Sequence, residues 1–159
     1  MLETNKPEGA ERREREHEIT MAVNEHFVWQ SLLTGTVATP VDRIFHNGLR
    51  ITAVAEIKSR DQSLDTFKRW GTGLISVGKL IEGKTASTIL GCDFYVIIGT
   101  IDHHIIAWQV YDHDGARLFD FDHEQRQTQK HISQPDDTKV DHVALLPIAE
   151  ADIWKDHTP

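Results

Sequence analysis

Residues 41–60 read VDRIFHNGLRITAVAEIKSR, in which two stretches of alternating apolar and polar residues meet at His46-Asn47-Gly48. Asn-Gly is a strong signal for a tight hairpin turn, so we predict two antiparallel strands over residues 41–45 and 49–58. Successive side chains of a strand point in opposite directions, which gives the second strand two faces. One face carries Thr52, Val54, Glu56 and Lys58, and the other carries Ile51, Ala53, Ala55 and Ile57. The second set is apolar, and we expect it to pack against a helix.

The segments on either side of this hairpin predict a mixed α/β fold. Residues 11–33 contain no Gly or Pro and have apolar residues at helical spacing, which predicts one long helix. Residues 61–83 also have helical spacing, interrupted at Gly71 and Gly73. Residues 94–100 and 105–111 predict two strands and 117–121 a short third one, whereas the Gln-rich residues 122–139 are typical of a loop. We therefore expect a small mixed central sheet flanked by helices.

The length of 159 residues corresponds to one domain, at roughly 150 residues per domain. We expect a lead-in without regular structure over residues 1–10, a single domain over 11–150 and a frayed tail over 151–159. Hydrophobic residues make up 39% of the chain and charged residues 26%, as in soluble folded proteins. No apolar stretch approaches the roughly 20 residues that cross a bilayer. The sequence thus predicts a cytoplasmic protein with no membrane partner.

The net charge of −8 argues against a polyanionic partner, but the charges are unevenly distributed. Residues 41–84 contain 8 Lys or Arg and 5 Asp or Glu, whereas residues 85–159 contain 5 and 13. The segment from the hairpin onward to residue 84 is therefore basic within an acidic protein. An acidic C-terminal half is usually a solvated surface, and the alternative is a site for a basic partner.

Three charged residues of the predicted hairpin form a candidate site. Glu56 and Lys58 are two positions apart on one strand and project from the same face, and Asp42 lies across the hairpin within reach. Two carboxylates, a backbone carbonyl and a substrate phosphate are suitable ligands for Mg²⁺, which prefers oxygen. A lysine beside such an ion positions the attacking water or offsets charge on the phosphate. The alternative is a cross-strand salt bridge on a solvated face of the sheet.

These residues resemble the PD-(D/E)XK nuclease superfamily, whose members share the restriction-endonuclease-like fold. The resemblance lies in Pro40-Val41-Asp42, thirteen further residues and then Glu56-Ile57-Lys58, after a Glu-rich helix and before a helix and a strand pair. It covers residues 11–110, and Val41 separates the proline from Asp42 where the family motif has the two adjacent. The similarity is to small phage-type members or to members like the Holliday junction resolvases. It implies a restriction-endonuclease-like core.

The resemblance also implies an activity, namely metal-dependent hydrolysis of phosphodiester bonds in DNA to give 5′-phosphate and 3′-hydroxyl products. Asp42 and Glu56 match the residues that bind the divalent metal, Mg²⁺ or Mn²⁺. Lys58 matches the lysine that serves the hydrolytic water. We expect the Ile57 backbone carbonyl to complete the ligand set.

Many members use a glutamate of the first helix as an additional metal ligand. Glu16 is our choice, because it precedes Ile19 and Val23 by three and seven residues and so shares the stripe that faces the sheet. Glu18 falls about 200° away around the helix and is the runner-up. Glutamates on an exposed helix face are otherwise only solvated.

Four basic residues follow the motif and are expected to contact phosphates, namely Arg60, Lys68, Arg69 and Lys79. Lys79 looks like a lysine that some small phage-type members carry on this helix. In a continuous helix it would share a face with Lys68, which lies eleven residues earlier. Trp70, beside Arg69, is a candidate for stacking on a base. The alternative readings are solubilising side chains and a core tryptophan.

The partner that the resemblance implies is DNA, in repair, recombination or phage genome processing, and members that cut both strands work as homodimers. A non-catalytic nucleic-acid-binding or structural protein on the same fold is the alternative function. The complete set of Asp42, Glu56 and Lys58 argues against that alternative.

Overall fold

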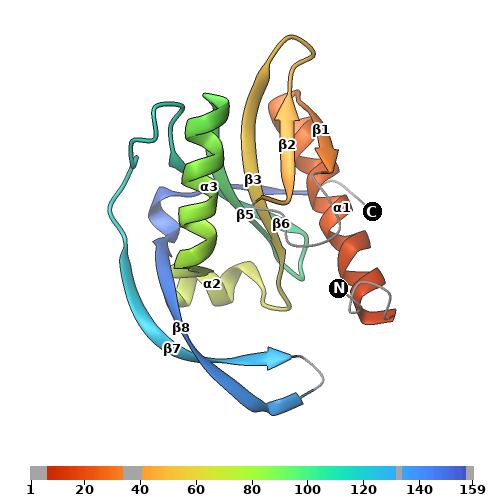
Figure 1. The fold of residues 1–159 in the computed structure, drawn as a ribbon. Coiled ribbons are helices and arrows are strands. Elements are labelled where there is room, and N and C mark those ends of the chain that lie inside the picture. Colours follow the sequence, from red (N-terminus) through yellow and green to blue (C-terminus); the bar gives the residue numbers. More distant parts are fainter. Residues whose placement is uncertain (1–6, 34–40, 132–133, 157–159) are drawn as a thin grey trace.

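The computed structural model describes residues 7–33, 41–131 and 134–156 (Figure 1). The elements in chain order are α1 (Pro7–Phe27), β1 (Gln30–Leu33), β2 (Arg43–His46), β3 (Ile51–Ser59), α2 (Leu64–Trp70), β4 (Thr72–Ser76), α3 (Val77–Leu90), β5 (Asp93–Gly99), β6 (His104–Tyr111), β7 (Asp122–His131), β8 (Gln134–Pro147), the 3-10 helix η2 (Ile148–Glu150) and β9 (Asp152–Lys155). No helix among the described residues has the length and apolar character needed to span a membrane.

Six strands form the central sheet, in the order β1-β2-β3-β5-β6-β9. β3 and β5 are parallel, whereas the other neighbouring pairs are antiparallel, so the sheet is mixed. Helix α1 lies against one face of this sheet, and α2 and α3 lie against the other (Figure 1). The predicted α/β class, with a mixed central sheet flanked by helices, is therefore confirmed.

The predicted hairpin is formed by β2 and β3. Gly48 has a φ of 88°, in the left-handed region that favours glycine, and the Asn47 side chain accepts the backbone N–H groups of Leu49 and Arg50, each at 3.0 Å. Arg43 lies opposite Ala55 in the antiparallel register. The turn therefore sets the register in which the start of β2 lies beside the C-terminal half of β3.

The two faces of β3 are covered by different helices. The predicted packing of its apolar face against a helix is confirmed except for Ile51, which packs against the other core cluster. Ala53, Ala55 and Ile57 are fully buried and pack with Ile19 and Val23 of α1. The opposite face turns toward α2 and α3, where Val54 packs in a second core cluster together with residues of both helices. Glu56 and Lys58 share this second face, because they follow Val54 at intervals of two residues.

A second sheet of three strands, in the order β4-β8-β7, lies beside the central sheet. β4 pairs with residues 143–147 of β8, at the base of the β7-β8 hairpin. The remainder of this hairpin projects beyond the body of the protein as a curved arm below α2 (Figure 1).

The first helix is shorter than predicted at its C-terminal end. It ends at Phe27, and Gln30–Leu33 forms β1 rather than the last turns of a helix over residues 11–33. Val28 has a φ of 58°, in the left-handed region, which ends the helix. This conformation is uncommon for a valine, so the sequence carries no signal for the stop. The helix begins at Pro7, inside the predicted lead-in, where a proline suits the first turn.

A continuous helix over residues 61–83 is wrong, whereas the predicted interruption at Gly71 is confirmed. Helix α2 ends at Gly71, which has a φ of 75°, and the chain then forms β4 before α3 begins at Val77. The Ser63 side chain accepts the N–H of Thr66 and caps the start of α2. Lys68 and Lys79 consequently lie on two different helices, and the shared face predicted for them is wrong.

Two further segments differ from the prediction. Within the segment predicted as a loop over residues 122–139, residues 122–131 form β7 and residues 134–139 belong to β8. Residues 117–121, predicted as a short strand, contain only an isolated bridge between Arg117 and Tyr111. The predicted frayed tail is wrong for Asp152–Lys155, which forms β9 and pairs with β6 at the edge of the central sheet. Residues 157–159 of that tail, and residues 1–6 of the lead-in, lie outside the described residues.

Candidate active site

Five charged side chains meet near the C-terminal end of β3. Glu56 and Lys58 lie on β3, Asp42 immediately precedes β2, Glu16 lies on α1, and Lys79 lies in the first turn of α3. Ion pairs and electrostatic contacts connect them. The structure thus brings together the three residues of the predicted hairpin site, the preferred glutamate of the first helix and one of the four predicted phosphate contacts.

The Glu56 carboxylate is the buried centre of this cluster, with 2% of its side chain exposed. The Nζ atom of Lys58 lies 3.0 Å from Glu56 Oε1, and the Nζ atom of Lys79 lies 4.0 Å from the same oxygen. Neither oxygen of Glu56 accepts a hydrogen bond of good geometry from the residues that the structure describes. Two ammonium groups therefore face Oε1 of one buried carboxylate, and Oε2 has no hydrogen-bond partner among the described residues.

Asp42 is held in place by the backbone of β3. Its Oδ2 atom accepts the N–H of Ile57 at 2.9 Å, and its own N–H donates to the carbonyl of Ala55 at 3.0 Å. The N–H and C=O groups of one strand residue point to the same side of the strand, so the Ile57 carbonyl is directed toward the edge where Asp42 lies. The carboxylate of Asp42 and the Ile57 carbonyl are thus presented at one end of the hairpin.

The electrostatics of the cluster are dominated by burial. Burial raises the pKa of Glu56, the ammonium group of Lys58 lowers it, and the nearby carboxylate of Asp42 raises it again. Burial likewise raises the pKa of Glu16, with Asp42 as the next contributor in the same direction. Glu16 and Glu56 thus occupy one region in which their negative charge is unfavourable, as is common where a protein holds a cation or a catalytic acid.

The two glutamates of α1 that the sequence left as alternatives face different surroundings. Glu16 interacts electrostatically with Asp42 and Lys58, and it is half-buried. Glu18 is exposed and lines a separate cavity. The geometry therefore favours Glu16 as the helical glutamate of the cluster.

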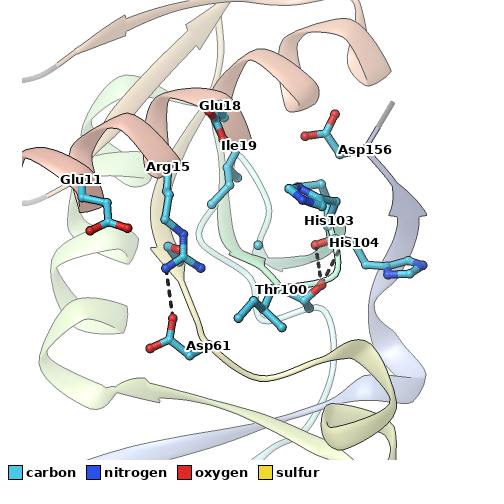
Figure 2. Close-up of a pocket in the computed structure, with 13 residues that line it drawn as sticks. Glu11, Arg15, Glu18, Ile19, Asp61, Thr100, His103, His104 and Asp156 are labelled. Carbon is cyan, nitrogen blue, oxygen red and sulfur yellow. Dashed lines mark hydrogen bonds and ion pairs between the residues drawn. The ribbon is translucent and has the colours of Figure 1, made fainter. Parts of the chain in front are cut away.

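That cavity has a volume of about 410 Å³ and lies between α1 and the turn that joins β5 to β6 (Figure 2). Arg15 lines it and forms an ion pair with Asp61 at 3.0 Å, while Thr100 and His103 line it from the turn. Ser59, the residue after Lys58, is its link to the cluster, and neither Glu56 nor Lys58 lines it. The cavity is consequently next to the acidic and basic cluster and distinct from it.

The other predicted phosphate contacts are placed differently. Arg60 is half-buried, its N–H donates to the Gly99 carbonyl at 3.0 Å, and burial lowers the pKa of its guanidinium group. Lys68 and Arg69 are exposed on the last turn of α2. Within the described residues, neither forms an ion pair with a carboxylate of the cluster. The structure thus places Arg60 beside the site and leaves Lys68 and Arg69 on a neighbouring surface.

Two arginines of α1 lie near the cluster and were not selected by the sequence analysis. Arg12 interacts electrostatically with Glu16 and Arg60, and Arg15 donates to the Arg60 carbonyl at 3.2 Å. The sequence carries a signal for Arg12, because it precedes Glu16 by four residues and two such residues share one face of a helix.

The oxygen set fits a hard divalent cation. Mg²⁺ in proteins is usually held by one or two carboxylates, with waters and substrate phosphates as its other ligands. Asp42 and Glu56 supply two carboxylates, and the buried oxygens of Glu56 accept no well-formed hydrogen bond from the described residues. The same residues contain no group of three or more His, Cys, Asp and Glu side chains arranged to hold a metal. A cation here would therefore depend on two carboxylates, the Ile57 carbonyl and ligands from solvent or substrate.

Pro40 of the sequence motif lies outside the described residues.

No protein family matches the sequence, and no curated protein is similar to it. Among solved structures, the chain is similar to Hjc, a Holliday junction resolvase from the hyperthermophilic archaeon Archaeoglobus fulgidus, whose structure has a resolution of 1.6 Å. The TM-score is 0.44 and the sequence identity 12%, and the match covers 60% of this chain and 72% of the resolvase chain.

Proposed function

We propose that this protein is a metal-dependent nuclease that hydrolyses phosphodiester bonds in DNA, and that the elements from α1 to β9 form its nuclease domain. Asp42, Glu56 and Lys58 are its central residues, and Mg²⁺ or Mn²⁺ is its cofactor. The proposal joins the sequence resemblance to the PD-(D/E)XK nucleases with the geometry at the end of β3.

The buried carboxylate of Glu56 is the observation that carries the proposal. Burying an ionisable group costs several kcal/mol unless a partner compensates for it. Here burial outweighs the lysines, so the pKa of Glu56 is raised even though Lys58 Nζ is only 3.0 Å away. A surface salt bridge does not need a carboxylate that is buried, whereas a cation site gains from one whose Oε2 atom has no partner among the described residues.

A divalent ion bound by Asp42, Glu56 and the Ile57 carbonyl would polarise the phosphoryl oxygen and lower the pKa of a bound water. The residues of the chain have separate tasks. Asp42 and Glu56 bind and orient the cation. Lys58 has 30% of its side chain exposed and reaches the edge of the site, where its Nζ atom can donate to the attacking water and to the phosphate.

Substrate binding in this proposal depends on the cations around the cluster. Lys79 and Arg60 flank the carboxylates, and Arg12 lies near Arg60 on α1. Each contact of this kind neutralises a phosphate charge and releases a counterion, so affinity for DNA should fall steeply with salt. Local positive charge thus compensates for the net negative charge of the whole chain.

The test is cleavage of labelled linear duplex, single-stranded DNA, four-way junction and RNA with Mg²⁺, with Mn²⁺ and with a chelator. We expect cutting of at least one DNA substrate with either metal and none with the chelator. Purified, folded protein that cuts no substrate under any of these conditions would contradict the proposal.

The second candidate function is a non-catalytic nucleic-acid-binding protein on the same fold. The observation in its favour is that Lys58 and Glu56 already form an ion pair with each other. Thermal unfolding with and without Mg²⁺ separates the two, because a ligand that binds only the folded state raises its stability. A nuclease should be stabilised by Mg²⁺, and Asp42→Asn, which keeps an oxygen able to accept from Ile57, should lose that stabilisation. Equal unfolding temperatures with and without metal would favour the non-catalytic protein.

A further inference from the structure

Trp70 is exposed at the C-terminal end of α2, with 56% of its surface accessible. Its ring meets Phe67 edge-on, with the centroids 5.6 Å apart and the planes at 80°. Phe67 itself is 3% exposed and belongs to the core. The tryptophan is therefore held from below by a fixed aromatic ring while its own ring remains open to solvent.

A cavity of about 290 Å³ lies next to this ring. Its lining residues come from α2, from β4 and from both strands of the β7-β8 hairpin, and they are Trp70, Thr72, Leu74, Arg126 and Leu145. Leu74 lies directly opposite Leu145 in the pairing of β4 with β8, so the two side chains share one face of the second sheet. These leucines give the cavity an apolar floor, and Trp70 forms one wall.

Arg126 adds a second planar group to the cavity. Asp122 lies opposite Leu145 in the pairing of β7 with β8, and Arg126 follows Asp122 by four residues on the same strand, which places its side chain on the same face. Its Nε atom pairs with Glu124, which also lies on β7, and 45% of the Arg126 side chain is exposed. The guanidinium group is thus held by its neighbour and still accessible.

The chemistry of this cavity suits one kind of ligand in particular. A nucleobase stacks on an aromatic ring and on a guanidinium plane, and an apolar floor accepts its flat face. The one charged residue in the lining is the cation Arg126, and the adjacent last turn of α2 carries Lys68 and Arg69. Exposed cations around a stacking platform match a ligand whose bases are linked by phosphates, and of these cations Arg126 is paired with Glu124.

We propose that the cavity bounded by Trp70 and Arg126 binds an unpaired base of a single-stranded segment of the nucleic-acid substrate, an inference that rests on the proposed nuclease function. Bases within a duplex are stacked on one another and cannot enter, so the cavity distinguishes single-stranded segments from duplex. β4 leads from this cavity to the first turn of α3, which carries Lys79, over on the order of 17 Å of strand. A single-stranded segment held at Trp70 therefore lies near the cluster around Glu56 without occupying it.

The test measures binding rather than cleavage, with the wild-type protein and a chelator present. The probe is a short fluorescently labelled oligonucleotide, offered as a single strand and as a duplex. Trp70→Ala should weaken single-strand binding about 10-fold, because stacking on an aromatic ring is lost, while Trp70→Phe should retain most of it. Duplex binding should change by less than about 2-fold in both variants. Circular dichroism and the unfolding temperature confirm that each variant is folded.

Tryptophan emission provides a second readout. Trp108 is fully buried, and Trp29 and Trp154 are half-buried, so the single strand should quench mainly Trp70. The quenching should disappear in Trp70→Phe and persist in the matched control Trp154→Phe.

The outcomes also separate this inference from the proposed function. The inference would be overturned if Trp70→Ala and the wild type bound the single strand equally well. It would also be overturned if Trp70→Ala lost affinity for the single strand and for the duplex to the same extent, or if the wild type bound no single strand. A change of oligomeric state in Trp70→Ala with unchanged binding would assign the cavity to a second copy of the chain instead. If the wild type cuts nothing with metal but shows Trp70-dependent binding, the nuclease proposal fails and the base site stands.

Discussion

The Nζ atom of Lys58 lies 3.0 Å from Oε1 of Glu56, yet the pKa of Glu56 is raised rather than lowered. The reason is that 2% of the Glu56 side chain is exposed, and the cost of burying its charge exceeds the attraction of the lysine. An ion pair formed for stability would lower the pKa of the carboxyl group. Lys58 therefore compensates only part of the cost of burying the Glu56 charge, and a cation bound to this carboxylate would compensate more of it.

The first prediction concerns Glu56→Gln and stability. A carboxyl group with a raised pKa in the folded protein stabilises the fold below its ordinary value of 4.5, and that contribution is lost as the pH rises through the raised pKa. The variant removes the charge, so we expect its unfolding temperature near neutral pH to exceed that of the wild type by about 2–4 °C, or about 1 kcal/mol. The gain should vanish by about pH 4, where both side chains are neutral. Thermal melts in chelator across this range provide the measurement, and a variant less stable than wild type at neutral pH would show that the lysines outweigh burial.

The second prediction separates the two glutamates of α1. Glu16→Gln should lower the cleavage rate at limiting Mg²⁺ by about 10-fold, because it removes a carboxylate next to Asp42 and Lys58. Glu18→Gln is the matched control on the same helix, and its rate should stay within about 2-fold of wild type. The measurement is the rate as a function of Mg²⁺ concentration. The opposite ranking of the two variants would move the helical ligand to Glu18.

The third prediction concerns Lys79, which lies 4.0 Å from Glu56 Oε1 and 3.6 Å from Glu82 Oε2. Lys79→Ala should slow cleavage about 10-fold, since it removes a cation beside the site. It should also raise the pKa of Glu56 further and shift the acidic limb of the pH–rate profile to higher pH. Glu82→Gln removes the other partner of Lys79 and should leave the rate within about 2-fold. An unchanged acidic limb in Lys79→Ala would contradict the electrostatic link to Glu56.

The fourth prediction concerns the position of α3, which carries Lys79. A Cβ atom added at Gly83 would collide with the ring of Phe94, whereas one added at Gly78 would meet only Ser76 Oγ, at 3.6 Å. Gly83→Ala should therefore destabilise the protein by about 1–3 kcal/mol. Gly78→Ala, on the same helix, should be neutral or stabilise it by up to about 1 kcal/mol. Denaturant unfolding of the two variants measures both effects, and equal stabilities would show that α3 moves away from β5 at little cost.

The hairpin was predictable because its signals are local. Asn47-Gly48 sets the turn, and alternation sets the faces of β3 without any knowledge of the remaining chain. The pairing of Asp42 with the end of β3 follows from the same register. The grouping of Asp42, Glu56 and Lys58 was thus available from about twenty consecutive residues.

The parts that sequence reasoning missed depend on tertiary structure or on unusual backbone conformations. Val28 ends α1 in a left-handed conformation that is rare for valine, which converts the next residues into an edge strand. The arm strand β7 is polar on both faces over residues 122–127, all exposed, so it lacks the apolar alternation that marks a half-buried strand. β4 is short and lies between two helices, and its pairing partner β8 is far along the chain. Lys79 approaches Glu56 from α3, a separate helix that begins after β4.

The most direct test of the proposed site is Lys58→Ala against the matched control Lys155→Ala, assayed on whichever DNA substrate the wild type cuts fastest. Lys155 lies on β9, at the far edge of the central sheet from β1, and is exposed. Under single-turnover conditions with saturating Mg²⁺, Lys58→Ala should lose at least about 100-fold in rate with an unchanged circular dichroism spectrum, and Lys155→Ala should cut like the wild type. A folded Lys58→Ala protein that cuts at the wild-type rate would contradict the account.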